Sequence, residues 1–218
     1  MSPSKSRRRR PRKKQNNNTK WILVVALLIV VAVVVIVAYS MLGNNGSSGE
    51  TVPSSSKVLL ETSMGNITIQ LRDDMPITTG NFKNLVQEGA YDGTIFHRVI
   101  ADFMIQGGDP TTGPWSGGTI PNIQDEFSDN PENNKNVRGT VAMAKQSDGT
   151  GQVIANSGNS QFYINVVDNN YLDNTYSVFG DVIDGMDVVD RISEVATSGD
   201  PYNKPLEDVT LIKAQLID

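Results

Sequence analysis

The chain has 218 residues and a net charge of −5, but the charge is unevenly distributed. Residues 1–20 hold nine of the 19 basic residues and no acidic one, so the rest of the chain carries ten basic and 24 acidic residues. Such an acidic body argues against nucleic-acid binding by the domain that it forms. The chain has no cysteine, which excludes disulfides, thiol catalysis and thiolate metal sites.

A long apolar segment follows the basic tail. Residues 21–42 contain no charged side chain, and Trp21 and Tyr39 lie near its two ends, where membrane proteins carry interfacial aromatic residues. A helix over this segment spans about 33 Å, which matches a hydrocarbon core of about 30 Å. The segment therefore predicts one transmembrane helix. The positive-inside rule predicts that residues 1–20 are a cytoplasmic tail and that the chain after the helix lies outside the cytoplasm.

A cleaved signal peptide is the competing interpretation, with Ala38-Tyr39-Ser40 as a small-x-small cleavage site. The apolar run is longer than the roughly 7–15 residues of such peptides, so a membrane anchor is favoured. Residues 43–56 are rich in Gly, Ser and Asn and predict a flexible linker. The sequence thus predicts a single-pass protein, held in the lipid bilayer by residues 21–42, with a globular domain at residues 57–218.

Short strands dominate the predicted elements of this domain, and two helices accompany them. A helix is predicted from Pro76 to Gly89, because apolar residues recur there at helical spacing, and a second one at residues 186–192. The predicted strands are residues 57–61, 66–71, 95–100, 103–106, 140–144, 161–166, 177–183 and 209–216. Many short strands at this spacing are typical of a closed barrel or a sandwich, and the pattern alone does not choose between them.

Arg98 and Gln106 interrupt two apolar runs that are predicted to be strands. An isolated buried charge is costly, so Arg98 predicts either an ion pair or a functional role. Taken alone, these residues favour an ion pair, because the domain is acidic. His97 is the only histidine, and without further His or Cys it does not indicate a metal site. Since it alternates with Arg98 along a predicted strand, we expect it to face the opposite side and to be structural.

Four motifs in sequence order resemble the cyclophilins, a family of prolyl cis–trans isomerases. They are FHRVIADFMIQGGDPT at residues 96–111, RGTVAMA at 138–144, NSQFYI at 159–164 and VFGDVIDGM at 178–186. The resemblance covers residues 57–218, and INVVDN at 164–169 is similar to a prokaryotic-like branch. It implies a mainly β fold, a closed eight-stranded antiparallel β-barrel capped by two α-helices, which needs neither a metal nor another cofactor.

The resemblance also implies roles for individual residues. Arg98 matches the catalytic arginine of the family, and Gln106 matches the glutamine beside it. The floor and walls of the proline pocket match Phe103, Met104, Tyr163 and Leu172. The groove for the residue before proline matches Ala144, Lys145 and Gln161, whereas Tyr171 and Tyr176 lie where many members have Trp and His.

Several of these positions depart from the usual family residues. Tyr163 in place of Phe adds a hydroxyl that needs water or a partner. Tyr171 lacks the indole N–H of the usual Trp, so cyclosporin is expected to bind weakly, and Tyr176 in place of the rim His is expected to have a modest effect. Lys145 replaces an Asn and donates hydrogen bonds without accepting any. The loop at residues 146–160 is longer than the usual form and is predicted to affect the groove.

These observations predict a peptidyl-prolyl cis–trans isomerase that acts on X–Pro bonds of exported or surface proteins and assists their folding. Arg98 is the predicted catalytic residue, and proline-containing polypeptide segments are the predicted partners, with no nucleic acid among them. The alternative is a membrane-tethered module that binds proline peptides with little turnover. Lys145 and the loop at residues 146–160 are the features that favour this alternative.

Overall fold

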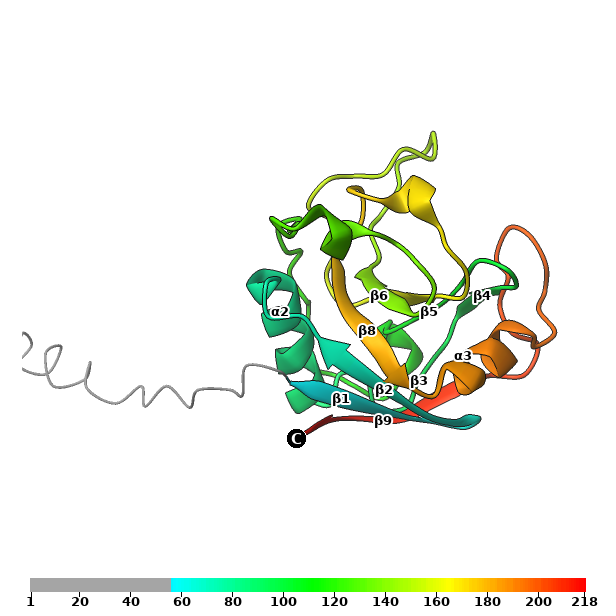
Figure 1. Cartoon of the computed structure of the whole chain (residues 1–218). Helices are drawn as coiled ribbons and strands as arrows, with labels where there is room; N and C mark the ends of the chain where they lie inside the picture. Colours follow the sequence, from blue (N-terminus) through cyan, green and yellow to red (C-terminus); the bar gives the residue numbers. More distant parts are fainter. Residues whose placement is uncertain (1–55) are drawn as a thin grey trace, which may run out of the picture. The chain divides into compact units, whose positions relative to one another are not determined.

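The computed structural model describes residues 56–218, so the predicted tail, membrane helix and nearly all of the linker lie outside the described residues. Within these residues, two α-helices, α2 (Pro76–Gln87) and α3 (Met186–Ser193), accompany a single sheet (Figure 1). The strands are β1 (Lys57–Thr62), β2 (Gly65–Leu71), β3 (Thr94–Ile95), β4 (Arg98–Ile100), β5 (Met104–Gly107), β6 (Thr140–Met143), β7 (Phe162–Asn165), β8 (Val178–Asp184) and β9 (Thr210–Ile217). None of the helices within residues 56–218 has the length and apolar character that crossing a membrane requires.

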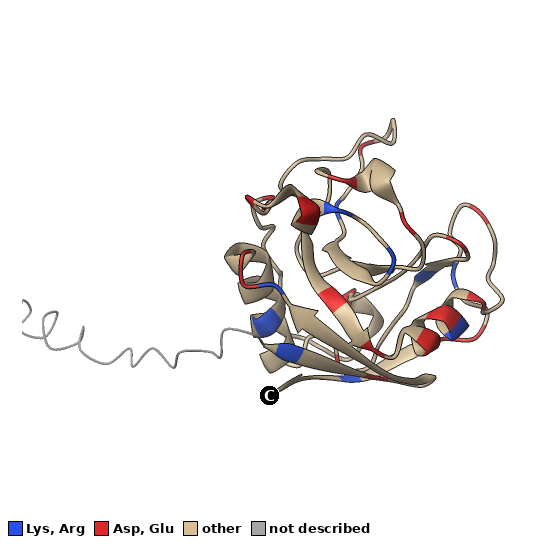
Figure 2. Cartoon of the chain, in the orientation of Figure 1, with Lys and Arg blue, Asp and Glu red and all other residues tan. Residues whose placement is uncertain are grey.

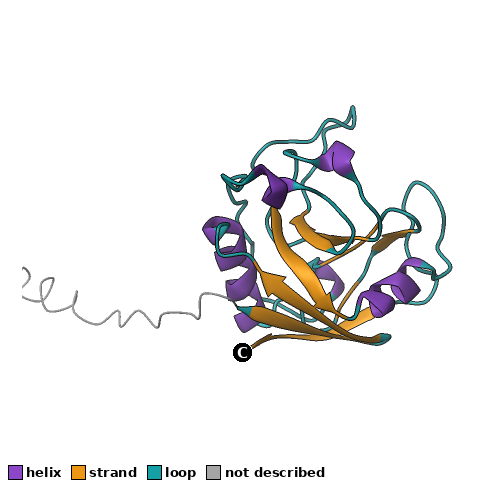
Figure 3. Ribbon diagram, viewed as in Figure 1, coloured by secondary structure: helices purple, strands orange, loops and turns teal. Residues whose placement is uncertain are grey.

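All strand pairs of the sheet are antiparallel, in the order β3-β9-β1-β2-β8-β6-β7-β5-β4. The sheet curls between the two helices (Figure 3). The prediction of a mainly β fold with two helices is thus confirmed. The predicted closed barrel of eight strands is wrong in two respects. The sheet has nine strands, and it curls without closing, because no ladder joins its edge strands β3 and β4 within the described residues.

The extra strand arises where the predicted strand at residues 95–100 changes its pairing partner. Its first part, β3, pairs with β9, whereas its second part, β4, pairs with β5. Between the two strands, the Phe96 N–H group still donates to the Val209 carbonyl just before β9. In β4, the Val99 N–H group donates instead to the Asn203 carbonyl, six residues earlier in the same connection between α3 and β9. The curled sheet therefore ends in two edges that follow one another in the chain.

Strand alternation sends apolar side chains to both faces of the sheet. The larger set forms one core, to which α2 contributes Phe82 and α3 contributes Val189, both fully buried. A smaller set on β5, β6, β7 and β8 faces away from this core. In β7, for example, Phe162 and Ile164 enter the core while Tyr163 between them joins the smaller set.

A remote carboxylate satisfies the first turn of α2. Pro76 occupies the first helical position, and no side chain next to it in sequence caps the helix. Instead the Glu126 carboxylate accepts hydrogen bonds from the N–H groups of Ile77 at 3.0 Å and Thr78 at 2.8 Å. The Glu126 N–H group in turn donates to the Ser177 hydroxyl at 3.0 Å. The segment that contains Glu126 is thus fixed between α2 and the start of β8.

Candidate active site

One row of cross-strand neighbours connects the predicted catalytic arginine to the predicted proline pocket. Arg98 on β4 lies opposite Gln106 on β5, and Gln106 lies opposite Tyr163 on β7. Tyr163 lies opposite Ala142 on β6, and Ala142 lies opposite Val178 on β8. Since directly opposed residues of an antiparallel sheet share a face, the register alone brings these five side chains to one surface.

A β-bulge completes this row at β8. The register shifts between Val141 and Ala142, which pair with Gly180 and Val178 respectively, so Phe179 is the extra residue. Phe179 is fully buried in the main core, and Val178 is buried in the smaller set. The bulge therefore lets two consecutive apolar residues of β8 serve both faces of the sheet.

The smaller apolar set, here called the site cluster, has a buried floor and a partly exposed rim. The floor consists of the buried residues Met104, Ala142, Tyr163 and Val178. The rim consists of the partly buried residues Ile100, Phe103, Ala144, Leu172 and Tyr176. Tyr171 is 72% exposed and stacks on Phe103 with ring centroids 6.1 Å apart. The structure thus brings together all the residues predicted to line the proline pocket.

Arg98 lies at the edge of the site cluster with a neutral partner. Its Nη1 donates to Gln106 Oε1 at 3.3 Å, and no carboxylate within residues 56–218 lies at ion-pair distance from it. Burial raises the pKa of Tyr176 and of Tyr171, and the Arg98 charge opposes both shifts, which places the guanidinium near both rings. The expectation that favoured an ion pair for Arg98 from its local sequence is therefore wrong.

A chain of side-chain amides continues from Arg98 into the neighbouring groove. Gln106 Nε2 donates to Gln161 Oε1 at 2.9 Å, and Gln161 Nε2 donates to Asp109 Oδ2 at 3.0 Å. These bonds leave Gln106 with its Oε1 atom facing the guanidinium. The arginine is thus oriented without being neutralised.

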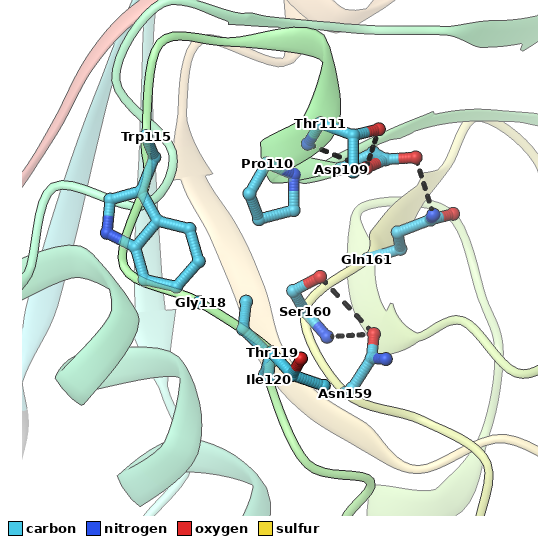
Figure 4. Close-up of a pocket in the computed structure, with 10 residues that line it drawn as sticks. All are labelled: Asp109, Pro110, Thr111, Trp115, Gly118, Thr119, Ile120, Asn159, Ser160 and Gln161. Carbon is cyan, nitrogen blue, oxygen red and sulfur yellow. Dashed lines mark hydrogen bonds between the residues drawn. The ribbon is translucent and has the colours of Figure 1, made fainter.

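Two cavities adjoin Gln161. One, of about 450 Å³, is lined by the three residues predicted to hold the residue before proline, Ala144, Lys145 and Gln161, together with the base of the loop at residues 146–160. The other, of about 480 Å³, lies between Gln161 and Trp115, and Figure 4 shows Asp109 bridging Gln161 and Thr111 at its rim. The side chain of Gln161 therefore forms a wall that the two cavities share.

Lys145 lines its cavity, but its ammonium group is already bound. Nζ donates to Asp125 Oδ2 at 2.7 Å and to the Thr175 carbonyl at 2.8 Å, and it lies 5.8 Å from the centre of the Tyr176 ring. The side chains of Lys145 and Asp125 are only 5% and 17% exposed. Lys145 thus joins three segments of the rim instead of extending into the groove.

The loop at residues 146–160 forms a small hairpin. Ser147 and Val153 form a β-bridge, and Asp148 Oδ1 accepts hydrogen bonds from the N–H groups of Thr150 and Gln152. Ser157, near the loop's end, accepts from the Gln146 N–H group at 2.9 Å. The two ends of this loop therefore line the cavity next to Lys145, through Gln146, Ser147, Ser157 and Asn159.

His97 lies beside the groove, contrary to the expectation from strand alternation. It precedes β4 and is not part of it, so the alternation that governs Arg98 does not apply to it. Burial lowers the pKa of His97, and the negative charge of Asp109 and a polar contact with Gln161 partly oppose this shift. Its Nδ1 atom is buried and has no hydrogen-bond partner among residues 56–218. His97 therefore lies near the Asp109–Gln161 pair.

Sequence reasoning missed several polar residues of this site. Asp125, Asp109 and Asn136 bind Lys145, Gln161 and the Tyr163 hydroxyl respectively. Each is far in sequence from its partner, so no local pattern indicates these pairs. The only signal was chemical, because a buried lysine and a buried tyrosine hydroxyl both need partners. Within residues 56–218, no group of three or more metal-ligating side chains is assembled.

The Lys145–Asp125 pair predicts a specific stability pattern. Asp125→Ala leaves a buried ammonium unpaired, and we expect it to lower the free energy of unfolding by about 3 kcal/mol. Asp125→Ala with Lys145→Met removes the unpaired charge and is expected to recover part of the loss. Urea unfolding of the full chain measures both. Glu132→Ala, which breaks the exposed Glu132–Lys135 pair, is the control and should cost less than about 1 kcal/mol. Equal losses for Asp125→Ala and Glu132→Ala would contradict the prediction.

The lowered pKa of His97 predicts a pH dependence of stability. A histidine in an unfolded chain has a pKa of about 6.5, whereas the pKa of His97 in the folded protein is lower. The stabilisation from the neutral imidazole is thus complete above about pH 6.5 and is lost as the pH falls from there towards the folded pKa. We expect His97→Gln to flatten this part of the stability profile. Because His97 is the only histidine, NMR titration follows it directly, and an imidazole pKa at or above about 6.5 would contradict the prediction.

Comparisons with known proteins agree with this geometry. Residues 57–216 match the family described as cyclophilin type peptidyl-prolyl cis-trans isomerase/CLD. A peptidyl-prolyl cis-trans isomerase of Acinetobacter baylyi is 44% identical, over 73% of this chain and 84% of that protein, and peptidyl-prolyl cis-trans isomerase B of Escherichia coli is 42% identical, over 71% and 95%.

Solved structures give the same result. A crystal structure of a cyclophilin type isomerase of Cryptosporidium parvum covers 75% of this chain and 98% of its own, with 28% identity and a TM-score of 0.64. A second structure, of that protein in the presence of the dipeptide Ala-Pro, covers 74% and 99% at 29% identity with a TM-score of 0.63. The family match over most of the chain, together with these identities, shows that this chain belongs to the cyclophilin-type peptidyl-prolyl cis–trans isomerases.

Proposed function

We propose that this isomerase acts outside the cytoplasm, tethered to a membrane, on X–Pro bonds of exported or surface proteins, with Arg98 as its catalytic residue. The observation that carries the catalytic part is the state of Arg98. Its guanidinium is held by a neutral glutamine at the edge of an apolar cluster, and no carboxylate within residues 56–218 neutralises it.

The chemistry of the reaction requires little more than this arrangement. The X–Pro amide resists rotation by about 18–20 kcal/mol, because its nitrogen shares a lone pair with the carbonyl. Rotation breaks this conjugation and returns the lone pair to the prolyl nitrogen. A guanidinium directed at that nitrogen stabilises the twisted amide and interacts weakly with the planar one, so the barrier falls. Arginine suits the role because it stays protonated and presents a rigid set of donors.

The magnitudes explain why Arg98 adjoins an apolar cluster. Bringing a process of tens of seconds to milliseconds takes about 10⁴-fold, or roughly 5–6 kcal/mol. One charge-assisted hydrogen bond supplies about 1.5–3 kcal/mol. The remainder is assigned to the site cluster, which excludes water from the guanidinium and holds the proline ring while the preceding carbonyl turns.

The groove suits the chain that precedes the proline. The residues predicted to hold that chain line a single cavity, which continues from the site cluster through Ala144. In the related Cryptosporidium parvum protein, a structure was solved in the presence of the dipeptide Ala-Pro. We infer that a proline-containing segment here places its ring on the site cluster and its preceding residue beside Gln161.

The membrane part of the proposal comes from the sequence of residues 1–42. The basic tail and the uncharged apolar segment predict an anchor with the isomerase domain outside the cytoplasm. A tethered isomerase in that position would meet polypeptides as they emerge from the membrane, when their X–Pro bonds are still exposed. This assignment is tested independently of catalysis.

Arg98→Ala tests the catalytic assignment. We expect kcat/KM for a short X–Pro peptide, measured on the full chain by exchange NMR, to fall about 100-fold, because a preorganised charge at the reacting nitrogen is lost. Peptide binding should change by less than about threefold, because the apolar cluster is intact. Arg191→Ala, which removes an exposed arginine paired with Asp187, is the matched control and should keep full activity. A small loss in Arg98→Ala, comparable with that in Arg191→Ala, would refute the assignment.

Cysteine labelling tests the topology, because the natural chain has no cysteine. Gly149→Cys lies at an exposed loop position where a side chain meets nothing within 4 Å, and Ser4→Cys lies in the basic tail. In intact cells, a membrane-impermeant maleimide should label Gly149→Cys and not Ser4→Cys, which reacts only after permeabilisation. Labelling of both residues, or of Ser4→Cys alone, would contradict the predicted orientation, and loss of Ser4 from the mature chain would indicate cleavage.

A further inference from the structure

A group of buried amide side chains lies next to the site cluster, and the mechanism above does not use it. Asn136 and Asn165 are fully buried, and Asn169 and Thr140 are at most 3% exposed. Asn165 Nδ2 donates to Thr140 Oγ1 at 2.9 Å and to Asn136 Oδ1 at 3.3 Å. Asn169 Nδ2 donates to Asn165 Oδ1 at 2.8 Å. These four residues are here called the amide cluster.

The register of the sheet places the amide cluster directly beside the row of cross-strand neighbours that runs from Arg98 to Val178. Asn165 follows Tyr163 by two residues on β7, so both face the same side, and Asn165 lies opposite Met104 of the site cluster. The amide cluster therefore occupies the next row of the surface on which Arg98, Gln106 and Tyr163 lie.

The amide cluster holds three separate parts of the proline site. The Tyr163 hydroxyl donates to Asn136 Oδ1 at 2.7 Å. Asn169 Nδ2 donates to the Phe103 carbonyl at 2.9 Å. The third part is the turn that carries Tyr171 and Leu172, which hydrogen bonds with Asn136 hold at both of its ends.

At the first end of this turn, the Asn169 N–H group donates to the Asn136 carbonyl at 2.7 Å. At the second end, the Asn136 N–H group donates to Asp173 Oδ1 at 2.7 Å. Asn136 thus binds the turn through its backbone and Tyr163 through its side chain.

Stability alone does not account for this arrangement. Asn136 Nδ2 is buried with no hydrogen-bond partner among the described residues, and an unpaired buried amide destabilises a fold. Apolar residues would fill the same volume without an unpaired group, whereas directional hydrogen bonds restrict the geometry of the side chains that they join. The amide cluster instead orients the ring of Tyr163. This ring packs edge-to-face with that of Tyr176, with an interplanar angle of 86° and ring centroids 5.6 Å apart.

The Tyr163 hydroxyl is suited to a permanent bond of this kind. Burial raises the pKa of Tyr163 above its usual value, so at neutral pH the hydroxyl keeps its proton and donates to Asn136. The hydrogen-bond partner that a buried tyrosine hydroxyl needs is therefore supplied by the Asn136 side chain.

We propose that Asn136 is a positioning residue of the isomerase, which acts through the Tyr163 hydroxyl to hold the floor of the proline site in its productive geometry. This inference rests on the proposed function, because it assumes that the proline ring lies on the site cluster beside Arg98. Asn136 touches no substrate in this account. Its effect on catalysis arises because small displacements of a positioned group lower the rate strongly.

A double-mutant cycle on the full chain tests the proposal, with kcat, KM and urea unfolding measured for each variant. Tyr163→Phe deletes the hydroxyl and keeps the ring, and Asn136→Ala deletes the acceptor. We expect each to lower kcat/KM about fivefold to tenfold, mainly through kcat, and the double variant to lose no more than the larger single loss. The two changes should therefore be non-additive in activity.

Asn134→Ala is the matched control. Asn134 is also buried, and its side chain exchanges two hydrogen bonds of 2.8 Å with the backbone of Ser128, away from the site cluster. It should lower stability about as much as Asn136→Ala and leave kcat/KM within twofold of the natural chain. Activity of Asn136→Ala that matches Asn134→Ala would show a merely structural role and overturn the proposal.

Two further outcomes keep the test decisive. Independent, multiplying losses in the double variant would mean that Asn136 does not act through Tyr163, which also overturns the proposal. If Asn136→Ala does not fold, Tyr163→Phe still decides, because full activity in that variant removes the proposed link. Arg98→Ala is measured in the same assay: failure of that variant to lose activity refutes the proposed site, whereas an uncoupled cycle with an inactive Arg98→Ala refutes only the role of Asn136.

Discussion

The antiparallel register across β4, β5, β7, β6 and β8 is the constraint on which the site depends. It places Arg98, Gln106, Tyr163, Ala142 and Val178 in one row on the face of the sheet that the main core does not use. A slip of one residue in any of these pairs would turn the functional side chains into the core. The bulge at Phe179 and the buried packing of Phe162 and Ile164 fix the register, so the core holds this row of side chains in place.

Charge distinguishes Arg98 from the other arginines of the described domain. Acidic positions occur on helices, strands and loops of the domain (Figure 2). Arg72, Arg138 and Arg191 each bind a carboxylate of Asp181, Asp190 and Asp187 respectively. Arg98 alone among the arginines of residues 56–218 lies beside neutral amides. In so acidic a domain, keeping one guanidinium free of carboxylates requires that the surrounding positions be apolar or amide, which describes the site cluster and the Gln106–Gln161 chain.

Much of this arrangement could be predicted from the sequence. Arg98 and Gln106 stood out as polar residues within two apolar runs, and the four motifs assigned the residues that the structure gathers around Arg98. The pairing change between β3 and β4 could not be predicted from the local sequence. It depends on the tertiary fold, which brings β9 beside the first half of one apolar run and β5 beside the second half. The predicted orientation of His97 was wrong because of this break between β3 and β4. His97 lies outside both strands, so strand alternation does not apply to it.

The departures from the family pattern were visible in the sequence, but their consequences were not. From the sequence, Lys145 was expected to alter the groove. In the structure its ammonium group donates to Asp125 and to the Thr175 carbonyl, so it links segments of the rim. Tyr163 pointed to an unknown partner, which proved to be Asn136, 27 residues away. Such partners follow from tertiary packing, because no local periodicity relates residues so far apart in the chain.

The position of the Arg98 guanidinium against a bound substrate tests the central claim most directly. A crystal structure of the protein with a short Ala-Pro-containing peptide would measure it. We expect the proline ring to lie on Met104 and Tyr163, with an Arg98 Nη atom within about 3.2 Å of the prolyl nitrogen. A guanidinium that turns to a carboxylate, or a proline ring bound away from the site cluster, would contradict it.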